Sequence, residues 1–374
     1  INRMLDQDDV IIHFWQNVVN QALQNRASDI HVEPENGVSH IRLRIDGHLK
    51  HLTSSPSNWH ERIASRIKIL ARLDIAEKRL PQDGQMLIGY QEHVPNFDCR
   101  ISTLPTLHGE KIVLRILNQS ADDLNLDLLG FTDRQLVDLK LALSRPQGFI
   151  LVTGPTGSGK THTLYSCLKQ LMDGTKNLTS IEDPIEVQLK GVNQVHVNEK
   201  AGLRFDNALR ALMRQDPDVI MVGEIRDLKT AEVAFQAAET GHLVLATLHA
   251  NDAPSALWRL KQLGIGLDQL ANNLICITAQ RLVRLFCHHC AGQLTLANNE
   301  LCHICNGTGF KGRTGIHQVL PINHDLRIMI ESGATLTAIH QYCQFSQIIN
   351  LQESAQLLVD KGITSETEAM RYAA

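Results

Sequence analysis

The chain has 374 residues, which is enough for about two or three domains that each bury a hydrophobic core. Its formal net charge of -4 argues weakly against a nucleic-acid partner, and no apolar run reaches the about 18 residues that would cross a bilayer. No secretory signal is visible either, so we expect the protein in the cytoplasm.

Residues 1–118 are predicted to form an α+β unit. Apolar residues recur at helical spacing over 10–25, and a second amphipathic helix with solvated charges is predicted over 59–73. Between them, Asp46-Gly47 follows an alternating apolar pattern and supplies the two positive-φ positions of a type I′ hairpin turn. The rest of the unit is predicted to hold a turn over 81–84 and strands over 97–103 and 111–117.

A polar linker over 119–126 is predicted to lead into an α/β core over 127–283. Thr132 and Gln135 have the spacing of a capping box, which predicts a helix start, and Arg145-Pro146 predicts the end of that helix. Short apolar runs then alternate with helical stretches, which is the pattern of a parallel sheet covered on both faces. The predicted strands are 149–152, 178–181, 219–222 and 243–246.

The first of these strands leads into Thr-Gly-Pro-Thr-Gly-Ser-Gly-Lys-Thr, the pattern of a phosphate-binding loop. Its small residues let backbone N–H groups surround phosphates, while Lys160 is expected to reach the β and γ phosphates and the Thr161 hydroxyl to bind Mg²⁺. A helix beginning at Thr161 would point its positive end at the same charge. We therefore predict that ATP binds at Gly154, Pro155, Thr156, Gly157, Ser158, Gly159, Lys160, Thr161 and His162.

Polar side chains follow the other three predicted strands. Glu182, Asp183 and Glu186 follow the second strand, Glu224 follows the third, and His249 follows the fourth. Because ligands of open α/β sheets bind beyond the carboxyl ends of the strands, these groups are expected to converge on one nucleotide. Glu224 is predicted to hold the metal or a metal-bound water, one of the other acids to orient the attacking water, and His249 to sense the γ phosphate. A solvated acidic loop and a structural histidine are the alternatives.

A cysteine-rich lobe is predicted over 284–318, and a helical subdomain over 319–374 follows it. Two Cys-x-x-Cys pairs, separated by eleven residues, supply the four soft ligands that tetrahedral Zn²⁺ requires. The nearby His288, His289 and His303 are left out of the ligand set, and a redox dithiol pair is the alternative. The predicted zinc ligands are Cys287, Cys290, Cys302 and Cys305.

Several longer stretches stand in the order found in one known family. They are Ala27-Ser-Asp-Ile-His, Arg42-Leu-Arg-Ile-Asp-Gly, Leu80-Pro-Gln-Asp-Gly, TSIEDPIE, RQDPDVIMVGEIRD, GHLVLATLHANDA and Gly312-Arg-Thr-Gly-Ile. Together with the phosphate loop and the cysteine pairs, they make the sequence resemble the secretion and pilus-assembly ATPase family, the motors of type II secretion systems and type IV pili. The resemblance covers nearly the whole chain.

The resemblance implies an α/β fold with a RecA-like P-loop motor domain, a preceding smaller PAS-like α+β domain, a small zinc-binding lobe and a helical tail. It also implies Mg²⁺-dependent ATP hydrolysis by a homo-hexamer, with nucleotide between the two domains. The implied partner is an inner-membrane platform protein of a secretion or pilus system, at the cytoplasmic face of that membrane, and no nucleic acid is expected. Arg100 matches a position from which the smaller domain contributes an arginine toward the phosphates, and Glu182 or Glu186, Glu224 and His249 match family site positions.

The sequence departs from the family pattern at two positions. Gln85 stands where an arginine usually follows Pro-Gln-Asp-Gly, so turnover is expected to be slow, and His162 stands where the family usually has Thr. No docking domain is visible before Asp9, so we do not expect this chain alone to dock on the membrane partner. The rival functions are a nucleic-acid translocase and a weakly hydrolysing nucleotide-binding adaptor.

Overall fold

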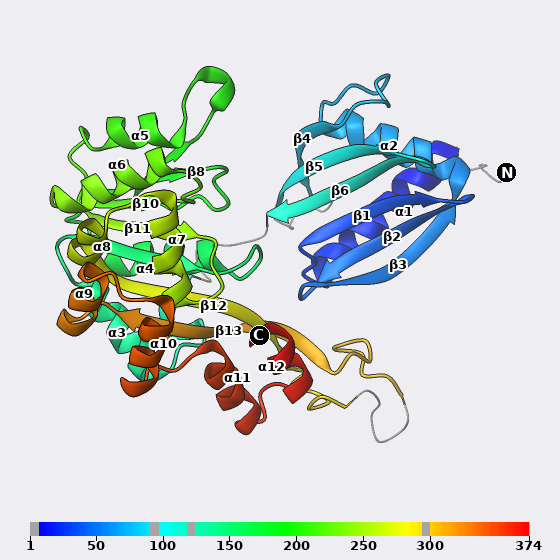
Figure 1. Cartoon of the computed structure of the whole chain (residues 1–374). Coiled ribbons are helices and arrows are strands. Elements are labelled where there is room, and N and C mark those ends of the chain that lie inside the picture. Colours follow the sequence, from blue (N-terminus) through cyan, green and yellow to red (C-terminus); the bar gives the residue numbers. More distant parts are fainter. Residues whose placement is uncertain (1–6, 90–96, 118–123, 294–299, 374) are drawn as a thin grey trace. The chain divides into compact units, whose positions relative to one another are not determined.

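The computed structural model describes residues 7–89, 97–117, 124–293 and 300–373 (Figure 1). The chain divides into two compact units, Ile1–Gln119 and Ser120–Ala374. Most of the predicted linker lies outside the described residues, and the boundaries predicted for the cysteine-rich lobe and the helical tail stay predictions. Within the described ranges, no helix combines the length and the apolar character that crossing a membrane requires.

The first unit is a six-stranded antiparallel sheet with two helices packed on one face. Trp15 and Ile63 from the helices and Ile30 and Ile101 from the sheet are fully buried in its core. The strand order is β3-β2-β1-β6-β5-β4. In chain order the elements are α1 (Gln7–Gln24), β1 (Asp29–Glu35), β2 (Val38–Ile45), β3 (His48–Pro56), α2 (Ser57–Leu70), β4 (Gln82–Ile88), β5 (Phe97–Thr106) and β6 (Gly109–Leu117).

The hairpin predicted in this unit is present between β2 and β3. Asp46 and Gly47 have φ angles of 49° and 84°, so both residues lie in the left-handed region that a type I′ turn requires. The strands pair from Ile45 opposite His48 outward, with one register shift after Arg42. The predicted turn geometry is therefore confirmed.

The turn predicted over 81–84 is wrong, because Gln82–Ile88 forms strand β4 and pairs with β5. Gly84 is not a turn residue; its missing side chain allows close packing against the chain that follows α2. A Cβ on this residue would lie 2.8 Å from Cδ2 of Leu73 and 3.1 Å from the carbonyl oxygen of Ala71. The glycine thus lets the chain that follows α2 lie directly against the strand.

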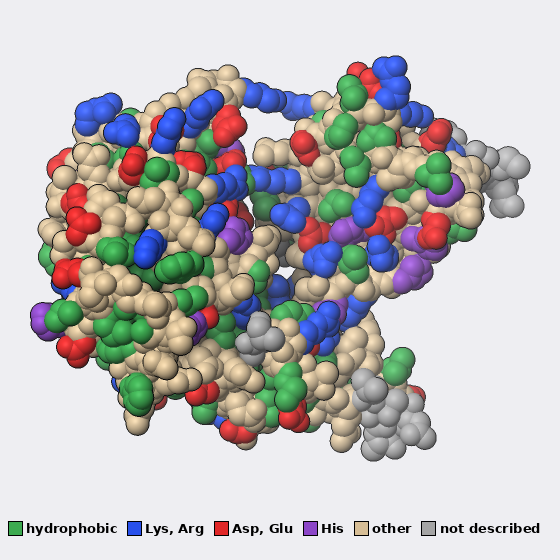
Figure 2. Space-filling model, in the orientation of Figure 1, with side chains coloured by type: hydrophobic (Ala, Val, Ile, Leu, Met, Phe, Trp, Pro, Cys, Tyr) green, Lys and Arg blue, Asp and Glu red, His purple; other side chains and the backbone are tan. Residues whose placement is uncertain are grey.

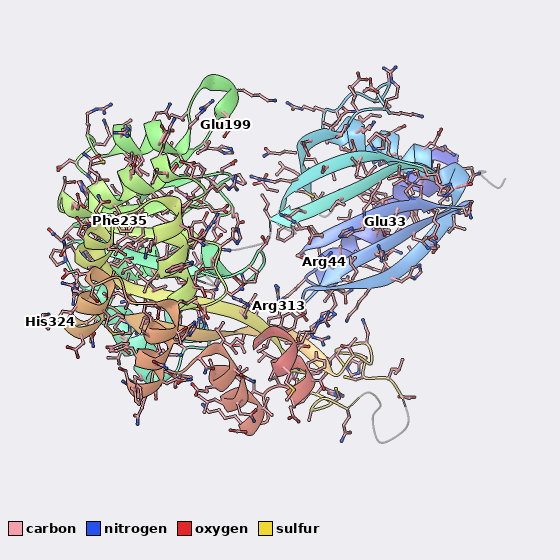
Figure 3. The ribbon with its side chains drawn as sticks, in the orientation of Figure 1. Glu33, Arg44, Glu199, Phe235, Arg313 and His324 are labelled. Carbon is pink, nitrogen blue, oxygen red and sulfur yellow. The ribbon has the colours of Figure 1, made fainter. Side chains whose placement is uncertain are left out.

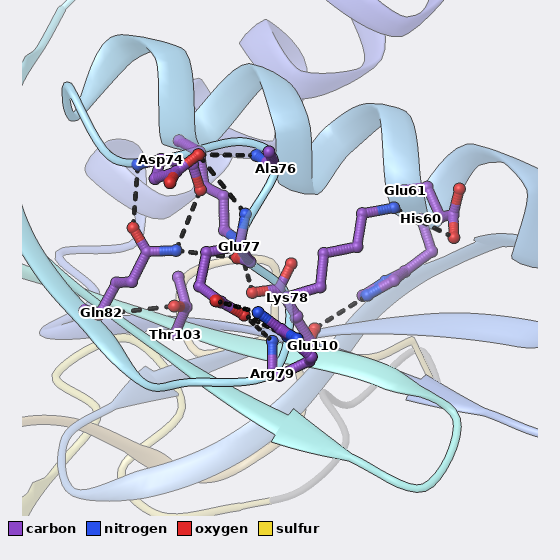
Figure 4. A network of polar contacts seen from close by, with 11 residues as sticks. His60, Glu61, Asp74, Ala76, Glu77, Lys78, Arg79, Gln82, Thr103 and Glu110 are labelled. Carbon is purple, nitrogen blue, oxygen red and sulfur yellow. Dashed lines mark hydrogen bonds and ion pairs between the residues drawn. The ribbon is translucent and has the colours of Figure 1, made fainter.

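The prediction that α2 keeps its charges in solvent is wrong for Lys68, which is 1% exposed. Its Nζ lies 2.6 Å from Oε1 of Glu110 on β6 and donates to the carbonyl oxygen of Glu77, 2.7 Å away. The Gln82 side chain holds the same loop through hydrogen bonds with Asp74 and Glu77 (Figure 4). Because Glu110 is distant in sequence, the helical pattern around Lys68 gives no sign that this charge is paired.

Charged side chains of β1 pair with those of its neighbours β2 and β6 on the sheet face opposite the core residues. Arg115 Nε lies 3.0 Å from Asp29 Oδ1, and Arg44 Nε lies 3.6 Å from Asp29 Oδ2. Glu33 and Arg44 are labelled in Figure 3. Burial opposes ionisation of Glu33, but hydrogen bonds from Arg42 and a neighbouring lysine lower the pKa of this carboxyl to about 2. Two of the motifs that support the family resemblance therefore hold this sheet together.

The second unit is built on a seven-stranded mixed sheet with the order β13-β12-β7-β11-β10-β8-β9. Six strands are parallel, including the four that the sequence predicts, and β13 adds an antiparallel strand beside β12 that was not predicted. This strand is antiparallel because β12 and β13 form one long hairpin, which needs no crossover helix. The strands are β7 (Gly148–Thr153), β8 (Leu178–Glu182), β9 (Val192–His196), β10 (Val219–Val222), β11 (Leu243–Leu248), β12 (Leu274–Phe286) and β13 (Phe310–Pro321).

Hydrophobic cores cover both faces of this sheet, as predicted. Phe149 and Leu151 of β7 belong to one core, and Ile150 and Val152 belong to the other. Phe235, labelled in Figure 3, lies on helix α6 (Leu228–Glu239) and stacks on Phe149 with the ring centroids 4.5 Å apart. The helices of the unit are η2 (Leu126–Leu128), α3 (Asp133–Leu143), α4 (Lys160–Leu171), η3 (Glu199–Ala201), α5 (Phe205–Leu212), α6 (Leu228–Glu239), α7 (Ala253–Leu263), α8 (Leu267–Asn273), α9 (His324–Glu331), α10 (Leu336–Phe345), α11 (Leu351–Asp360) and α12 (Glu366–Ala373).

Helix α3 begins at the predicted capping box. The Thr132 hydroxyl accepts a hydrogen bond from the Gln135 backbone N–H, and Gln135 Oε1 accepts one from the Thr132 backbone N–H, 3.0 Å away. Gln135 Nε2 also donates to the carbonyl oxygen of His317 on β13, at 2.6 Å. The cap therefore fixes the helix to the edge of the sheet as well as starting it.

Candidate nucleotide and metal sites

The segment between β7 and α4 contains the predicted phosphate loop. Gly154, Gly157 and Gly159 have φ angles of 151°, 79° and 87°, which residues with a Cβ rarely adopt. A Cβ on Gly154 would also lie 2.5 Å from the carbonyl oxygen of Gln280. Glycine is therefore required here, and the N-terminus of α4, where backbone N–H groups lack helical partners, follows directly.

Lys160 is the first residue of α4, and its side chain turns back over the loop. Its Nζ donates to the carbonyl oxygens of Gly154 and Pro155, at 2.9 and 3.1 Å. Burial lowers the pKa of Lys160, against the raising effect of the Glu224 and Glu186 carboxylates. A phosphate would offer this ammonium charged acceptors, which form stronger hydrogen bonds than the carbonyls do.

His249 connects the loop to the acid that follows β10. Its Nδ1 lies 3.0 Å from the carbonyl oxygen of Gly154, and its Nε2 lies 3.0 Å from Oε1 of Glu224. Both partners are acceptors, so both contacts are hydrogen bonds only when each ring nitrogen carries a proton. The structure thus brings together the loop, Glu224 and His249, three of the groups that the sequence predicts at this edge of the sheet.

Arg226 is a member of this cluster that the sequence reasoning missed. Its Nε donates to Oε2 of Glu224, 2.9 Å away, and its NH1 lies 3.9 Å from Oδ2 of Asp183. The hydrogen bond to Glu224 raises the pKa of the guanidinium. Arg226 therefore connects the acids that follow β10 and β8. Its position two residues after Glu224 is the feature of the sequence that could have predicted its place in the site.

The two glutamates predicted after β8 have different environments. Glu182 is 2% exposed and accepts hydrogen bonds from Ser180 Oγ at 2.6 Å, from Gln194 Nε2 at 3.0 Å, and from the Tyr165 hydroxyl. Glu186 is exposed, and its carboxylate acts electrostatically on the phosphate-loop lysine. Both roles stay predictions, and the surroundings of Glu186 favour it for contact with a water molecule.

Three further predicted site residues lie on helix α4 and on strand β5. Thr161 and His162 are half-buried in the first turn of α4. Arg100 belongs to the first unit, where it lies on β5 between Gln85 of β4 and Arg115 of β6 in the strand register. The predicted role of Arg100 at the phosphates stays a prediction.

The four cysteines of the two pairs are buried, and their sulfur atoms all lie within 4.8 Å of one another. Cys287 Sγ lies 3.9 Å from Cys302 Sγ, and Cys290 Sγ lies 3.6 Å from Cys305 Sγ. Tetrahedral zinc with Zn–S bonds of about 2.3 Å places its sulfur ligands roughly 3.8 Å apart. The Gly309 backbone N–H donates to Cys305 Sγ, 3.3 Å away. The donor set and its spacing therefore fit a structural zinc ion.

A sheet whose parallel strands end at a glycine-rich phosphate loop, a carboxylate and a histidine is the arrangement of a nucleoside triphosphatase. The chain belongs to the family described as type II/IV secretion system protein, whose model matches residues 4–371. The family prediction is thereby confirmed.

Three relatives document this membership. The chain is 42% identical to type II secretion system protein HxcR of Pseudomonas aeruginosa, over 99% of this chain and 79% of the relative. It is 44% identical to the protein transport protein HofB homolog of Escherichia coli, over 94% of this chain and 78% of the relative. It is 42% identical to the type IV pilus assembly ATPase PilB of Thermus thermophilus, over 96% of this chain but only 42% of that longer protein.

Two solved structures share the fold. The ATPase DotB of Legionella pneumophila has a TM-score of 0.75 at 19% identity, with 96% of this chain and 95% of that chain covered. The pilus retraction motor PilT with bound ADP has a TM-score of 0.66 at 27% identity, with 96% of each chain covered. The protein is accordingly an ATPase with the α/β fold of the secretion ATPases.

Proposed function

We propose that this ATPase is the Mg²⁺-dependent motor for assembly of a type IV pilus or of a type II secretion pseudopilus. The observation that carries the proposal is that two of the predicted site side chains meet at one atom, the carbonyl oxygen of Gly154. Lys160 and His249 both contact this oxygen, and His249 also contacts Glu224. Groups for phosphate binding, metal binding and sensing of the bound nucleotide therefore share one small region at the carboxyl edge of the sheet.

Each group has a distinct part in this proposal. The loop amides and Lys160 hold the phosphates, and the Thr161 hydroxyl and Glu224 hold the metal ion or a water bound to it. Bound Mg²⁺ would offset the phosphate charge. Glu186 orients the attacking water, and His249 exchanges its contact with Gly154 or Glu224 for one with the γ phosphate. Glu182 accepts a hydrogen bond from the Tyr165 hydroxyl, which in turn accepts one from the Glu186 backbone N–H. Glu182 thereby keeps Tyr165 and the segment around Glu186 in place.

The finer features of the proposal come from the family resemblance. The second unit is a RecA-like motor domain, and the first unit is a PAS-like domain that supplies Arg100. Six chains form a ring at the cytoplasmic face of the inner membrane and act on a platform protein there. Zinc at Cys287, Cys290, Cys302 and Cys305 holds a small lobe together without entering the reaction.

The direct test is Lys160→Ala with a phosphate-release assay. Hydrolysis should be lost while the unfolding temperature stays within a few degrees of that of the unchanged protein, because Lys160 donates its hydrogen bonds to carbonyl oxygens of its own surface loop. Lys169→Ala, on the exposed face of the same helix, is the matched control and should keep full turnover. Retained hydrolysis in Lys160→Ala would refute this site.

Two further measurements separate the proposal from its rivals. On the face shown in Figure 2, acidic and basic side chains are interspersed over the second unit. Strong stimulation of hydrolysis by DNA would nevertheless favour a nucleic-acid translocase. Recovery of an integral membrane protein of a pilus or secretion system with the tagged chain would support the proposed partner, and nucleotide binding without phosphate release would favour an adaptor.

A further inference from the structure

On the basis of the proposed function, we infer that Gln280 and Arg281, consecutive residues of β12, are positioning residues of the ATPase site. Gln280 fixes the phosphate loop, and Arg281 fixes the loop that carries His249. The two residues lie where β12 pairs with β7, since Ala279 is opposite Thr153 in the strand register. Sequence reasoning assigns them no role.

The Gln280 side chain makes two hydrogen bonds that together fix its orientation. Its Nε2 donates to the carbonyl oxygen of Ser158, 2.6 Å away, and its Oε1 accepts from the Thr163 hydroxyl at 2.8 Å. Gln280, Ser158 and Thr163 are each no more than 3% exposed. One buried amide therefore joins the phosphate loop to the first turn of α4, where an unpaired polar group would be costly.

The backbone of the same residue also supports the loop. The carbonyl oxygen of Gln280 lies so close to Gly154 that a Cβ there would be 2.5 Å away. Gly154 is in turn the residue whose carbonyl oxygen contacts both Lys160 and His249. The position of this shared acceptor therefore depends directly on β12.

Arg281 makes the second connection and is 8% exposed. Its NH1 donates to the carbonyl oxygen of Gln280 at 3.1 Å, and its NH2 donates to the carbonyl oxygen of Asn251 at 2.8 Å. Asn251 stands two residues after His249, immediately before the Asp252 cap of α7. The planar guanidinium thus joins β12 to the His249 loop with a geometry that a lysine ammonium does not reproduce.

The two connections should affect different kinetic constants. Gln280 holds a loop that contacts the phosphates both before and during the reaction, so its loss should weaken nucleotide binding and raise KM. Arg281 holds the loop that carries His249, the residue proposed to contact the γ phosphate as the bond breaks. Its loss should therefore lower kcat with little change in KM.

The experiment compares Gln280→Met and Arg281→Lys with Arg284→Met in the full chain. Arg284 lies on the same strand but pairs with Glu368, so its variant controls for general weakening of β12. The readouts are kcat and KM for ATP, the Kd of a fluorescent ADP analogue, and the unfolding temperature. For Gln280→Met we expect KM and Kd to rise about tenfold with kcat within threefold. For Arg281→Lys we expect kcat to fall at least tenfold with KM within threefold.

Arg284→Met should lower the unfolding temperature and leave KM and Kd unchanged. If Gln280→Met does not fold, Thr163→Val removes one of the same hydrogen bonds at nearly equal volume, and it should raise Kd by about threefold. Unchanged KM and Kd in the glutamine or threonine variant would overturn the role of Gln280.

Normal kcat in Arg281→Lys would show that only the charge matters and would overturn the positioning role of Arg281. Absence of hydrolysis in the unchanged protein would count against the proposed function alone, because the ADP measurement still tests Gln280.

Discussion

His249 Nε2 lies 3.0 Å from Glu224 Oε1, while the other ring nitrogen lies 3.0 Å from the carbonyl oxygen of Gly154. The carboxylate after β10 and the loop after β7 are thus joined through a single imidazole. A phosphate oxygen is an acceptor as well, so a phosphate that displaces either contact would move the ring while each ring nitrogen still donates. We therefore expect a movement of His249 to report the state of the nucleotide to Glu224.

Glu224→Gln keeps the size of the side chain and removes its negative charge. We expect turnover to fall at least about 100-fold, because an amide neither accepts a proton nor holds a metal-bound water as a carboxylate does. The affinity for ATP should change by less than a few fold, since the loop and Lys160 remain. Phosphate release and binding of a fluorescent ATP analogue measure the two effects. Glu232→Gln, at an exposed position of α6, is the control, and normal turnover in Glu224→Gln would transfer the role to Glu186.

Gln85→Arg should raise the rate of hydrolysis several fold. Gln85 is exposed and stands opposite Arg100, which stands opposite Arg115 on the next strand, so the new guanidinium would add to an existing group of positive charges. The unfolding temperature should fall slightly because like charges on neighbouring strands repel. Leu87→Arg adds the same charge two residues further along β4, at a side chain that is 64% exposed, and should leave turnover unchanged. An equal effect of both variants would show that position 85 is not at the phosphates.

The cysteine cluster should hold one zinc ion per chain in elemental analysis of the purified protein. Cys302→Ser should remove most of this zinc and lower the unfolding temperature, because a tetrahedral site with three thiolates binds the ion more weakly. Cys343→Ser, at a buried cysteine outside the cluster, should retain the metal. Hydrolysis should survive in both variants. Metal-free protein with two titratable dithiols would favour the redox alternative.

His317 should make the second unit less stable as the pH falls. Its ring is 1% exposed, is stacked on Phe131 and donates from Nε2 to the carbonyl oxygen of Leu129, and burial lowers its pKa to about 4. Between pH 6.5 and pH 4 the unfolded chain binds a proton at this residue that the folded chain does not bind, so stability falls as the pH decreases. Over that window the expected loss is roughly 3 kcal/mol.

His317→Phe keeps a ring against Phe131 and removes the titrating group. The variant should be less stable at pH 8, because the hydrogen bond to Leu129 is lost, but its stability should depend less on pH between 6.5 and 4. Unfolding temperatures measured across this range provide the comparison. Burial also lowers the pKa of His31 and His60 in the first unit, and these contributions are the same in both proteins. Identical pH profiles would contradict the assignment.

Local signals in the sequence were sufficient where short-range physics decides the structure. The Thr132 capping box, the Asp46-Gly47 turn and the strand before the phosphate loop depend on neighbouring residues, and all are present. The adjacency of Glu224 and His249 followed from one rule about parallel strands. These parts of the fold and of the site could therefore be predicted.

The remaining features depend on partners that are distant in sequence. Gly84 looks like a turn residue until the chain after α2 packs against it, and Lys68 looks solvated until Glu110 approaches from β6. Gln280 shows no motif character, because its two partners are a backbone oxygen and a hydroxyl on another element. Such contacts exist only after the sheet has formed, so no window of sequence contains them.

The long hairpin of β12 and β13 has a consequence for how this protein could change during evolution. Phe286 and Phe310 form the last residue pair of β12 and β13, and their ring centroids are 5.4 Å apart. The strand pairing therefore ends at the residues that flank the cysteine cluster. The described residues between these two phenylalanines, 287–293 and 300–309, therefore extend from the tip of a completed ladder. Such a tip tolerates gain, loss or exchange of a whole segment without a shift in strand register. A short turn grafted between Phe286 and Phe310 should therefore leave the ATPase sheet intact.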